Sequence, residues 1–165
     1  MQPTYQQEKP GNTADRVVGI IGIVLFTCCS LGGAAGFVLS GGPDAPPPEL
    51  LPETWQAVAG LLVHVALLIG CIGILLGGRW GFLLTGIAAC VAIALFAFDL
   101  SQYPARREFG IEYLESGAGT EQQRAAVNAM ISGGPLFAIP PALVYLVYAV
   151  FSLLRLGGKF GPKPS

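Results

Sequence analysis

Four stretches of this sequence contain no Asp, Glu, Lys or Arg and consist mainly of apolar residues. An α-helix rises about 1.5 Å per residue and the hydrocarbon core of a bilayer is about 30 Å thick, so roughly 20 such residues make one span. The stretches comprise residues 17–39, 55–76, 80–98 and 131–154. We therefore predict an all-α membrane protein, a bundle of four transmembrane helices.

The remainder of the chain is too short to form a second domain. Hydrophobic residues make up 53% of the sequence and charged residues 12%, whereas a soluble domain has about 25% charged residues. Both ends are polar or rich in Gly and Pro, which disfavours a folded structure. We predict disordered tails at 1–15 and 157–165, a transmembrane domain at 16–156, and outer loops at 40–54 and 99–130.

The distribution of basic residues predicts the orientation in the membrane. Six of the 9 basic residues lie before the first stretch, between the second and third, or after the fourth: Lys9, Arg16, Arg79, Arg155, Lys159 and Lys163. Because basic residues near span ends tend to stay cytoplasmic, we expect both termini to be cytoplasmic. The sequence has no Asn-x-Ser/Thr glycosylation site. We therefore expect a multi-pass protein of a cell membrane, the bacterial inner membrane.

The loop at 99–130 contains the pattern of two short helices. After Pro104, the segment 105–116 places Phe109 and Tyr113 four residues apart, which is typical of a short amphipathic helix. Two glycines at 117 and 119 are expected to end it.

The second helix of this loop is expected to begin at a capping box. Thr120 and Gln123 have the spacing at which each side chain bonds the backbone amide of the other. This helix should continue into the fourth stretch, where Pro140 and Pro141 predict a kink. The loop as a whole is either a lid on the outer bilayer surface or a docking platform for a partner.

Small residues predict close packing between the helices. Association in lipid depends on van der Waals contact and hydrogen bonds, and small side chains let backbones approach. The connection at 77–79 is so short that the second and third helices must form an antiparallel hairpin. Pairs of small residues four apart occur at Gly32 and Gly36, Ala66 and Gly70, and Gly73 and Gly77.

His64 is the only histidine and lies close to the predicted midplane, about 13 Å from the outer boundary. A polar side chain at this depth needs a partner within the bundle. Tyr145 and Thr27 lie at a similar depth, and we expect Tyr145 to be the partner of His64 and Thr27 to be the second choice. The imidazole either has a structural role or belongs to a proton relay or ligand site.

A stripe of polar side chains follows one face of the fourth stretch. Pro141, Tyr145, Tyr148 and Ser152 are separated by 4, 3 and 4 residues, so they share a helical face. The stripe is either a hydrogen-bonded seam between helices or the wall of a groove for a lipid or small molecule. The candidate intramembrane polar site is therefore His64, Tyr145, Tyr148 and Thr27.

The sequence lacks the patterns of a metal site or an active site. His64, Cys28, Cys29 and Cys90 lie at similar depth, but there is no Cys-x-x-Cys pair and no second histidine. No nucleophile and base pair is recognisable either. We expect no metal, no cofactor and no catalytic activity.

Two classes of function remain open. The first is a non-catalytic accessory or scaffold subunit, since the charges all lie outside the spans and the helices are rich in small residues. The alternative is a channel or carrier for a small or apolar solute, with a midplane site around His64 and Tyr145. The expected partners are the lipid bilayer and another membrane protein or a second copy of the chain; we expect no nucleic acid.

Overall fold

The computed structural model describes residues 13–39, 45–133 and 139–157. All regular elements in these ranges are helices, so the predicted all-α fold is confirmed. In chain order they are α1 (Thr13–Leu39), η1 (Pro48–Leu50), α2 (Thr54–Leu75), α3 (Arg79–Glu115), α4 (Glu121–Gly133) and α5 (Ile139–Leu156).

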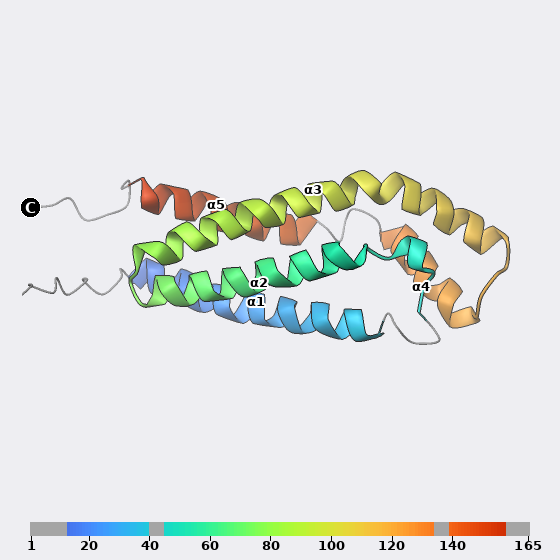
Figure 1. The fold of residues 1–165 in the computed structure, drawn as a ribbon, viewed down its shortest axis with the longest axis horizontal. Helices are drawn as coiled ribbons and strands as arrows, with labels where there is room; N and C mark the ends of the chain where they lie inside the picture. The colour runs from blue at the N-terminus through green and yellow to red at the C-terminus, as the bar shows by residue number, and fades with distance from the viewer. Residues whose placement is uncertain (1–12, 40–44, 134–138, 158–165) are drawn as a thin grey trace, which may run out of the picture.

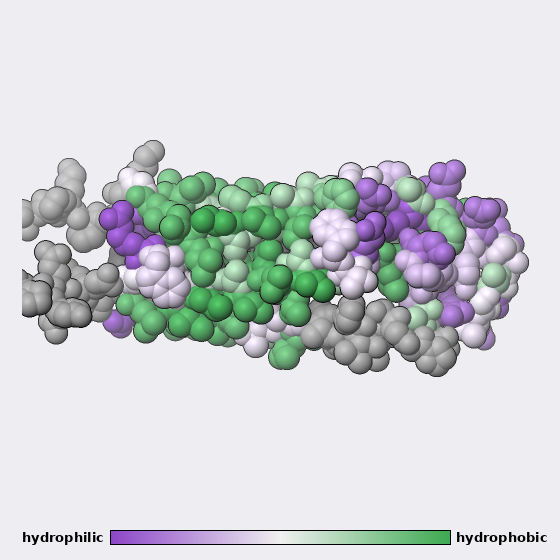
Figure 2. All heavy atoms as spheres, in the orientation of Figure 1, coloured by the Kyte–Doolittle hydropathy of each residue, from purple (hydrophilic) through white to green (hydrophobic). Residues whose placement is uncertain are grey.

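Four of these helices, α1, α2, α3 and α5, are long and apolar enough to cross a membrane. They lie side by side in an elongated bundle (Figure 1). Figure 2 shows that apolar residues cover the bundle in this view, whereas polar residues gather beyond one end of it. Large apolar side chains point outward, such as Leu62 (63% exposed) and Val147 (64% exposed). An apolar surface of this extent is unusual for a soluble protein.

The first helix begins earlier than the sequence predicted. Residues 13–15, which we expected in the disordered tail, form the first turn of α1. The rest of the two predicted tails lies outside the described residues, apart from Gly157.

The turn between α2 and α3 confirms the predicted antiparallel hairpin. Gly77 has a φ of 78°, the left-handed conformation that glycine adopts without a steric penalty. The amide of Gly78 donates to the carbonyl of Gly73 at 3.0 Å, and that of Gly77 to Ile74 at 3.0 Å. These two bonds form a Schellman motif, which satisfies the last carbonyls of α2.

Glycines bring α1, α2 and α3 into close backbone contact. Gly70 lies directly against Thr85, and Gly73 lies against Gly81 across the α2–α3 interface. In α1, Gly22 lies against Cys71 of α2 and the hydroxyl of Tyr148 of α5. The predicted role of Gly70 and Gly73 in packing is therefore confirmed. For Gly32 and Gly36 the packing lies outside the described contacts.

The third helix is longer than predicted, since α3 runs unbroken through Pro104 to Glu115 over 37 residues. The prediction of a separate helix at 105–116 is wrong. A proline inside a helix removes one backbone hydrogen bond and favours a bend, and α3 changes direction between its two halves (Figure 1). Arg106, two residues after Pro104, donates to Asp99, five residues before it, at 2.6 Å. This ion pair helps to hold the helix together where the proline weakens it.

The capping box at the start of α4 is confirmed. The Gln123 amide donates to Thr120 Oγ1 at 3.2 Å, and the Thr120 amide donates to Gln123 Oε1 at 2.9 Å. The prediction that this helix continues into the fourth span is not tested by the described residues. α4 ends at Gly133, α5 begins at Ile139, and residues 134–138 lie outside the described residues.

Residues 131–133, the start of the predicted fourth span, belong to α4, and the described part of the fourth apolar helix is Ile139–Leu156. Pro140 and Pro141 are the second and third residues of α5 within these bounds. The predicted kink concerns the junction of these prolines with residues 134–138, which lie outside the described residues, so it stays a prediction.

Beyond the bundle, η1, residues 99–115 of α3, and α4 pack together into what we call the head. Val127 of α4 and Leu50 of η1 are buried. Tyr103 Oη donates to the carbonyl of Ile131 at 3.0 Å, and Gln123 Nε2 donates to the carbonyl of Ala45 at 3.0 Å. The head continues along the bundle's long axis (Figure 1). The two interpretations of this loop, a lid on the outer bilayer surface and a docking platform for a partner, both stay predictions.

Candidate functional site

His64 of α2 and Tyr145 of α5 form a hydrogen bond in the interior of the bundle. The distance from Tyr145 Oη to His64 Nε2 is 2.7 Å, which confirms the predicted pairing. The other ring nitrogen, Nδ1, lies 2.7 Å from the carbonyl oxygen of Gly60, one helical turn earlier. Both nitrogens of the imidazole are therefore satisfied.

The partners determine where the protons lie. A carbonyl oxygen only accepts hydrogen bonds, so Nδ1 carries the hydrogen that is donated to Gly60. In a neutral imidazole the second nitrogen is then an acceptor, and the Tyr145 hydroxyl donates to it. The hydroxyl oxygen of Tyr145 keeps acceptor capacity for a further hydrogen bond.

Phe26 of α1 completes an aromatic cluster around this pair. It is 1% exposed, its ring stacks on Tyr145 with centroids 6.3 Å apart, and it meets His64 edge-on at 6.5 Å. Thr27, the second choice as partner, forms no hydrogen bond with His64 among the described contacts. Neighbouring residues on a helix point about 100° apart, so the burial of Phe26 turns Thr27 away from the imidazole.

Three residues of the stripe on α5, Tyr145, Tyr148 and Ser152, are buried, whereas Pro141 is exposed. Tyr148 Oη donates to the carbonyl of Val18 in α1 at 2.9 Å, so Tyr148 does not join the His64 pair. Ser152 is fully buried against Gly86 of α3. Tyr145 and Tyr148 thus connect α5 to two different helices.

A cavity of about 290 Å³ lies between α2, α3 and α5 at the head end of the bundle. We call the part lined by Gln56 and Asp99, nearer the head, its mouth, and the part lined by His64 and Tyr145, farther into the bundle, its floor. Gln56 and His64 are two turns apart, which corresponds to about 12 Å of helix. The wall between mouth and floor is formed mainly by apolar residues: Ala57, Gly60, Val63, Ala92, Leu95, Phe96 and Pro141.

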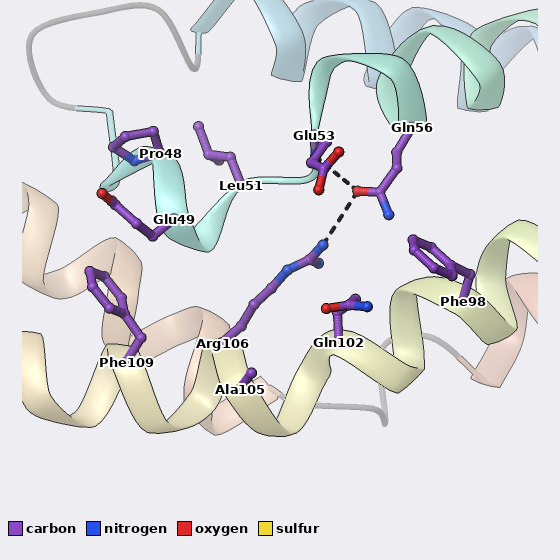
Figure 3. Close-up of a pocket in the computed structure, with 10 residues that line it drawn as sticks. All are labelled: Pro48, Glu49, Leu51, Glu53, Gln56, Phe98, Gln102, Ala105, Arg106 and Phe109. Atoms are coloured by element: carbon purple, nitrogen blue, oxygen red, sulfur yellow. Dashed lines mark hydrogen bonds between the residues drawn. The ribbon is translucent and has the colours of Figure 1, made fainter.

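A second cavity, of about 310 Å³, lies where the head meets the bundle. Figure 3 shows the side chain of Arg106 reaching from α3 toward Gln56 of α2, with Glu49 and Glu53 on the facing segment. Arg106 lines both cavities. It lies 3.4 Å from Gln56 Oε1 and 2.6 Å from Asp99. The guanidinium therefore stands between the two cavities with its charge balanced by Asp99.

At the opposite end of the bundle, Asp15 of α1 forms an ion pair with Arg155 of α5 at 2.6 Å. The two side chains are only 10% and 9% exposed. Arg155 also lies over the ring of Phe151, 5.5 Å from its centroid. Sequence reasoning missed this pair because Asp15 was assigned to the tail. No sequence pattern links Asp15 to Arg155, because the two residues lie far apart in the chain.

Among the described residues, no group of three His, Cys, Asp or Glu side chains is placed to hold a metal ion. All four cysteines are free thiols. The expectation that the protein uses no metal or cofactor remains a prediction.

Comparison of the chain with known protein families, with curated proteins and with solved structures finds no match.

Replacing His64 by Leu is expected to lower the free energy of unfolding only modestly. Interhelical hydrogen bonds in membrane proteins contribute about 0.6 kcal/mol on average, and about 1.7 kcal/mol at most. Unfolding in mixed detergent micelles would measure the change. Tyr145→Phe serves as the control, since it removes the same hydrogen bond with a smaller change in volume. A loss above 3 kcal/mol for either variant would contradict this account.

Proposed function

We propose that this protein is a non-catalytic integral membrane protein, a small accessory or scaffold subunit that presents its head to a partner. The observation that carries this proposal is the continuity of α3, which runs from the bundle into the head without interruption. A surface held on such a helix has a fixed position relative to the bundle. A partner would then be positioned at a defined distance from the membrane.

The proposed orientation places both termini in the cytoplasm and the head on the outer face of a bacterial inner membrane. The basic residues of the tails and of the α2–α3 turn support it. The Asp15–Arg155 pair and the α2–α3 turn lie at the same end of the bundle, opposite the head (Figure 1).

Cysteine labelling is expected to confirm this topology. In a variant without the four native cysteines, a membrane-impermeant maleimide should label Ser116→Cys in intact cells but not Ser165→Cys. Both sites should react after the cells are permeabilised, which controls for reactivity. Labelling of the residue at 165 alone in intact cells would show that the orientation is inverted.

The exposed face of the head carries an acidic stripe. Glu108, Glu112 and Glu115 follow at i, i+4 and i+7 on α3 and are all exposed. This face lies away from the contacts with η1 and α4. It is therefore the part of the head that we expect a partner to contact.

Co-purification from the native cells tests the proposed partner. Extraction with a bilayer-preserving polymer should recover a second protein in a fixed ratio to the wild-type chain. Glu108→Lys with Glu112→Lys should abolish recovery, whereas the lipid-facing control Leu62→Val should retain it. Recovery of the wild-type chain alone, with no protein in fixed ratio, would contradict a scaffold role.

The cavity that ends at His64 and Tyr145 favours a second candidate, a carrier for a small or apolar solute. Below the cavity, the buried side chains of Phe26, Leu67 and Ile74 fill the bundle. A carrier would therefore need a second conformation that opens toward the other end. Spin labels at positions 62 and 146, on the outer faces of α2 and α5, would report two distance populations for a carrier and one for a scaffold.

A further inference from the structure

Gly60 differs from the other described glycines of the spanning helices. A Cβ at these other positions would meet atoms of a neighbouring helix, as at Gly19, Gly22, Gly70, Gly73, Gly81 and Gly86. A Cβ at Gly60 would meet nothing within 4 Å. Helix packing therefore explains the other glycines but not Gly60. The absence of a side chain at Gly60 widens the cavity between α2, α3 and α5.

The wall of this cavity suits an uncharged molecule. The charges at its mouth, Asp99 and Arg106, already neutralise each other at 2.6 Å. An ionised ligand would have to separate this pair or enter an apolar region without a counter-charge, which is costly. The apolar wall beside Gly60 also offers a water molecule too few hydrogen-bond partners, since an ordered buried water needs two to four.

The floor of the cavity offers one polar contact of defined chemistry. The hydroxyl hydrogen of Tyr145 is donated to His64, and both imidazole nitrogens are occupied. The group left over is the acceptor oxygen of Tyr145. A ligand that reaches the floor must therefore donate a hydrogen bond.

We propose that this cavity binds a small, uncharged, mainly apolar molecule with one hydroxyl group. The hydroxyl donates to Tyr145 Oη, and the apolar body lies against Gly60, Leu95 and Phe96. A volume of about 290 Å³ is at the lower end of ligand cavities in proteins, which measure about 300–1,000 Å³, so the ligand is no larger than a medium-chain alcohol or a phenol. Binding does not require transport, and it is independent of the partner contacted by the head.

Photolabelling with a diazirine derivative of octanol, on the full chain in lipid nanodiscs, tests the proposal. We expect saturable labelling of the segments around Gly60 and Tyr145, mapped by mass spectrometry. An excess of unlabelled octanol should prevent it, whereas octane and octanoate should not. Labelling that does not saturate, or that octane prevents equally well, would overturn the proposal.

Two variants locate the site. Gly60→Leu should reduce saturable labelling at least tenfold, because its side chain fills open space. Tyr145→Phe should weaken binding about three- to tenfold, as expected for one lost hydrogen bond. The control Ala94→Leu introduces the same leucine side chain on the exposed face of α3 and should bind like the wild type.

Thermal unfolding of each variant in the same nanodiscs checks that the fold is retained. Saturable labelling in Gly60→Leu at the wild-type level would overturn the proposal, and so would an equal loss in Ala94→Leu. Neither result depends on co-purification of a partner, so this proposal and the scaffold function can fail separately.

Discussion

Arg155→Leu is expected to lower the free energy of unfolding by about 3 kcal/mol, because it leaves the carboxylate of Asp15 buried without its counter-charge. The pair joins the first turn of α1 to the last turn of α5 at 2.6 Å. The negative charge of Asp15 lies at the positive N-terminal end of α1, and the positive charge of Arg155 lies at the negative C-terminal end of α5, so both interactions with the helix dipoles are stabilising. We expect a value at the lower end of the range for broken buried pairs, since the pair lies at the end of the bundle.

The two partners are not equivalent. Arg155 has a long side chain that can reach water, and it retains the contact with the ring of Phe151. Asp15 has a short side chain that cannot. Asp15→Leu should therefore cost less than Arg155→Leu.

The double variant Asp15→Leu with Arg155→Leu is the control. Replacing both charges by apolar groups removes the unpaired charge, so we expect a loss of less than half that of Arg155→Leu alone. Unfolding in mixed detergent micelles would measure all three variants. Additive losses in the double variant would show that the two residues act independently, contrary to this account.

Gly81→Leu is expected to produce the second large effect, a loss of the close α2–α3 packing. A Cβ at Gly81 would lie 2.8 Å from the carbonyl oxygen of Gly70 and still closer to the backbone of Gly73 and Ile74. Backbone atoms cannot move aside as a flexible side chain can. Overpacking costs about 1–3 kcal/mol or more, and we expect the upper end of this range, because the two helices must separate.

Gly60→Leu is the matched control, since it makes the same change in another spanning helix where the space is open. We expect its thermal unfolding temperature to equal or exceed that of the wild type, because a glycine within a helix is less favourable than other residues. Thermal unfolding in one detergent would compare the two variants. If both variants lowered the unfolding temperature equally, the effect of Gly81→Leu would come from the general cost of leucine in these helices and not from contact with α2.

The four helices that are long and apolar enough to cross a membrane were predictable from the sequence. A long charge-free stretch favours a helix, since a helix satisfies the hydrogen bonds of its backbone within its own segment. The hairpin at Gly77 and the capping box at Thr120 were predictable too, because each depends on residues close in the sequence. The position of His64 along α2 followed from counting residues, and this position restricted its partner to a few residues of the other helices.

The sequence did not determine which helical face each residue presents to its neighbours. Phe26, not Thr27, lies beside His64, because the rotation of α1 depends on how it packs against α2 and α5. The cavity beside Gly60 has the same origin. A glycine that permits close approach and a glycine that leaves space look alike in a sequence.

The course of the chain beyond the bundle was also decided by tertiary structure. Pro104 and the glycines at 117 and 119 predicted a short separate helix, but α3 continues through the proline. Contacts with η1 and α4 outweigh the local preference there. The Asp15–Arg155 pair joins residues near opposite ends of the chain. The apolar pattern of the sequence thus determined that the chain forms four membrane-length helices, whereas long-range packing alone decided how these helices rotate, where a cavity remains and which charges meet.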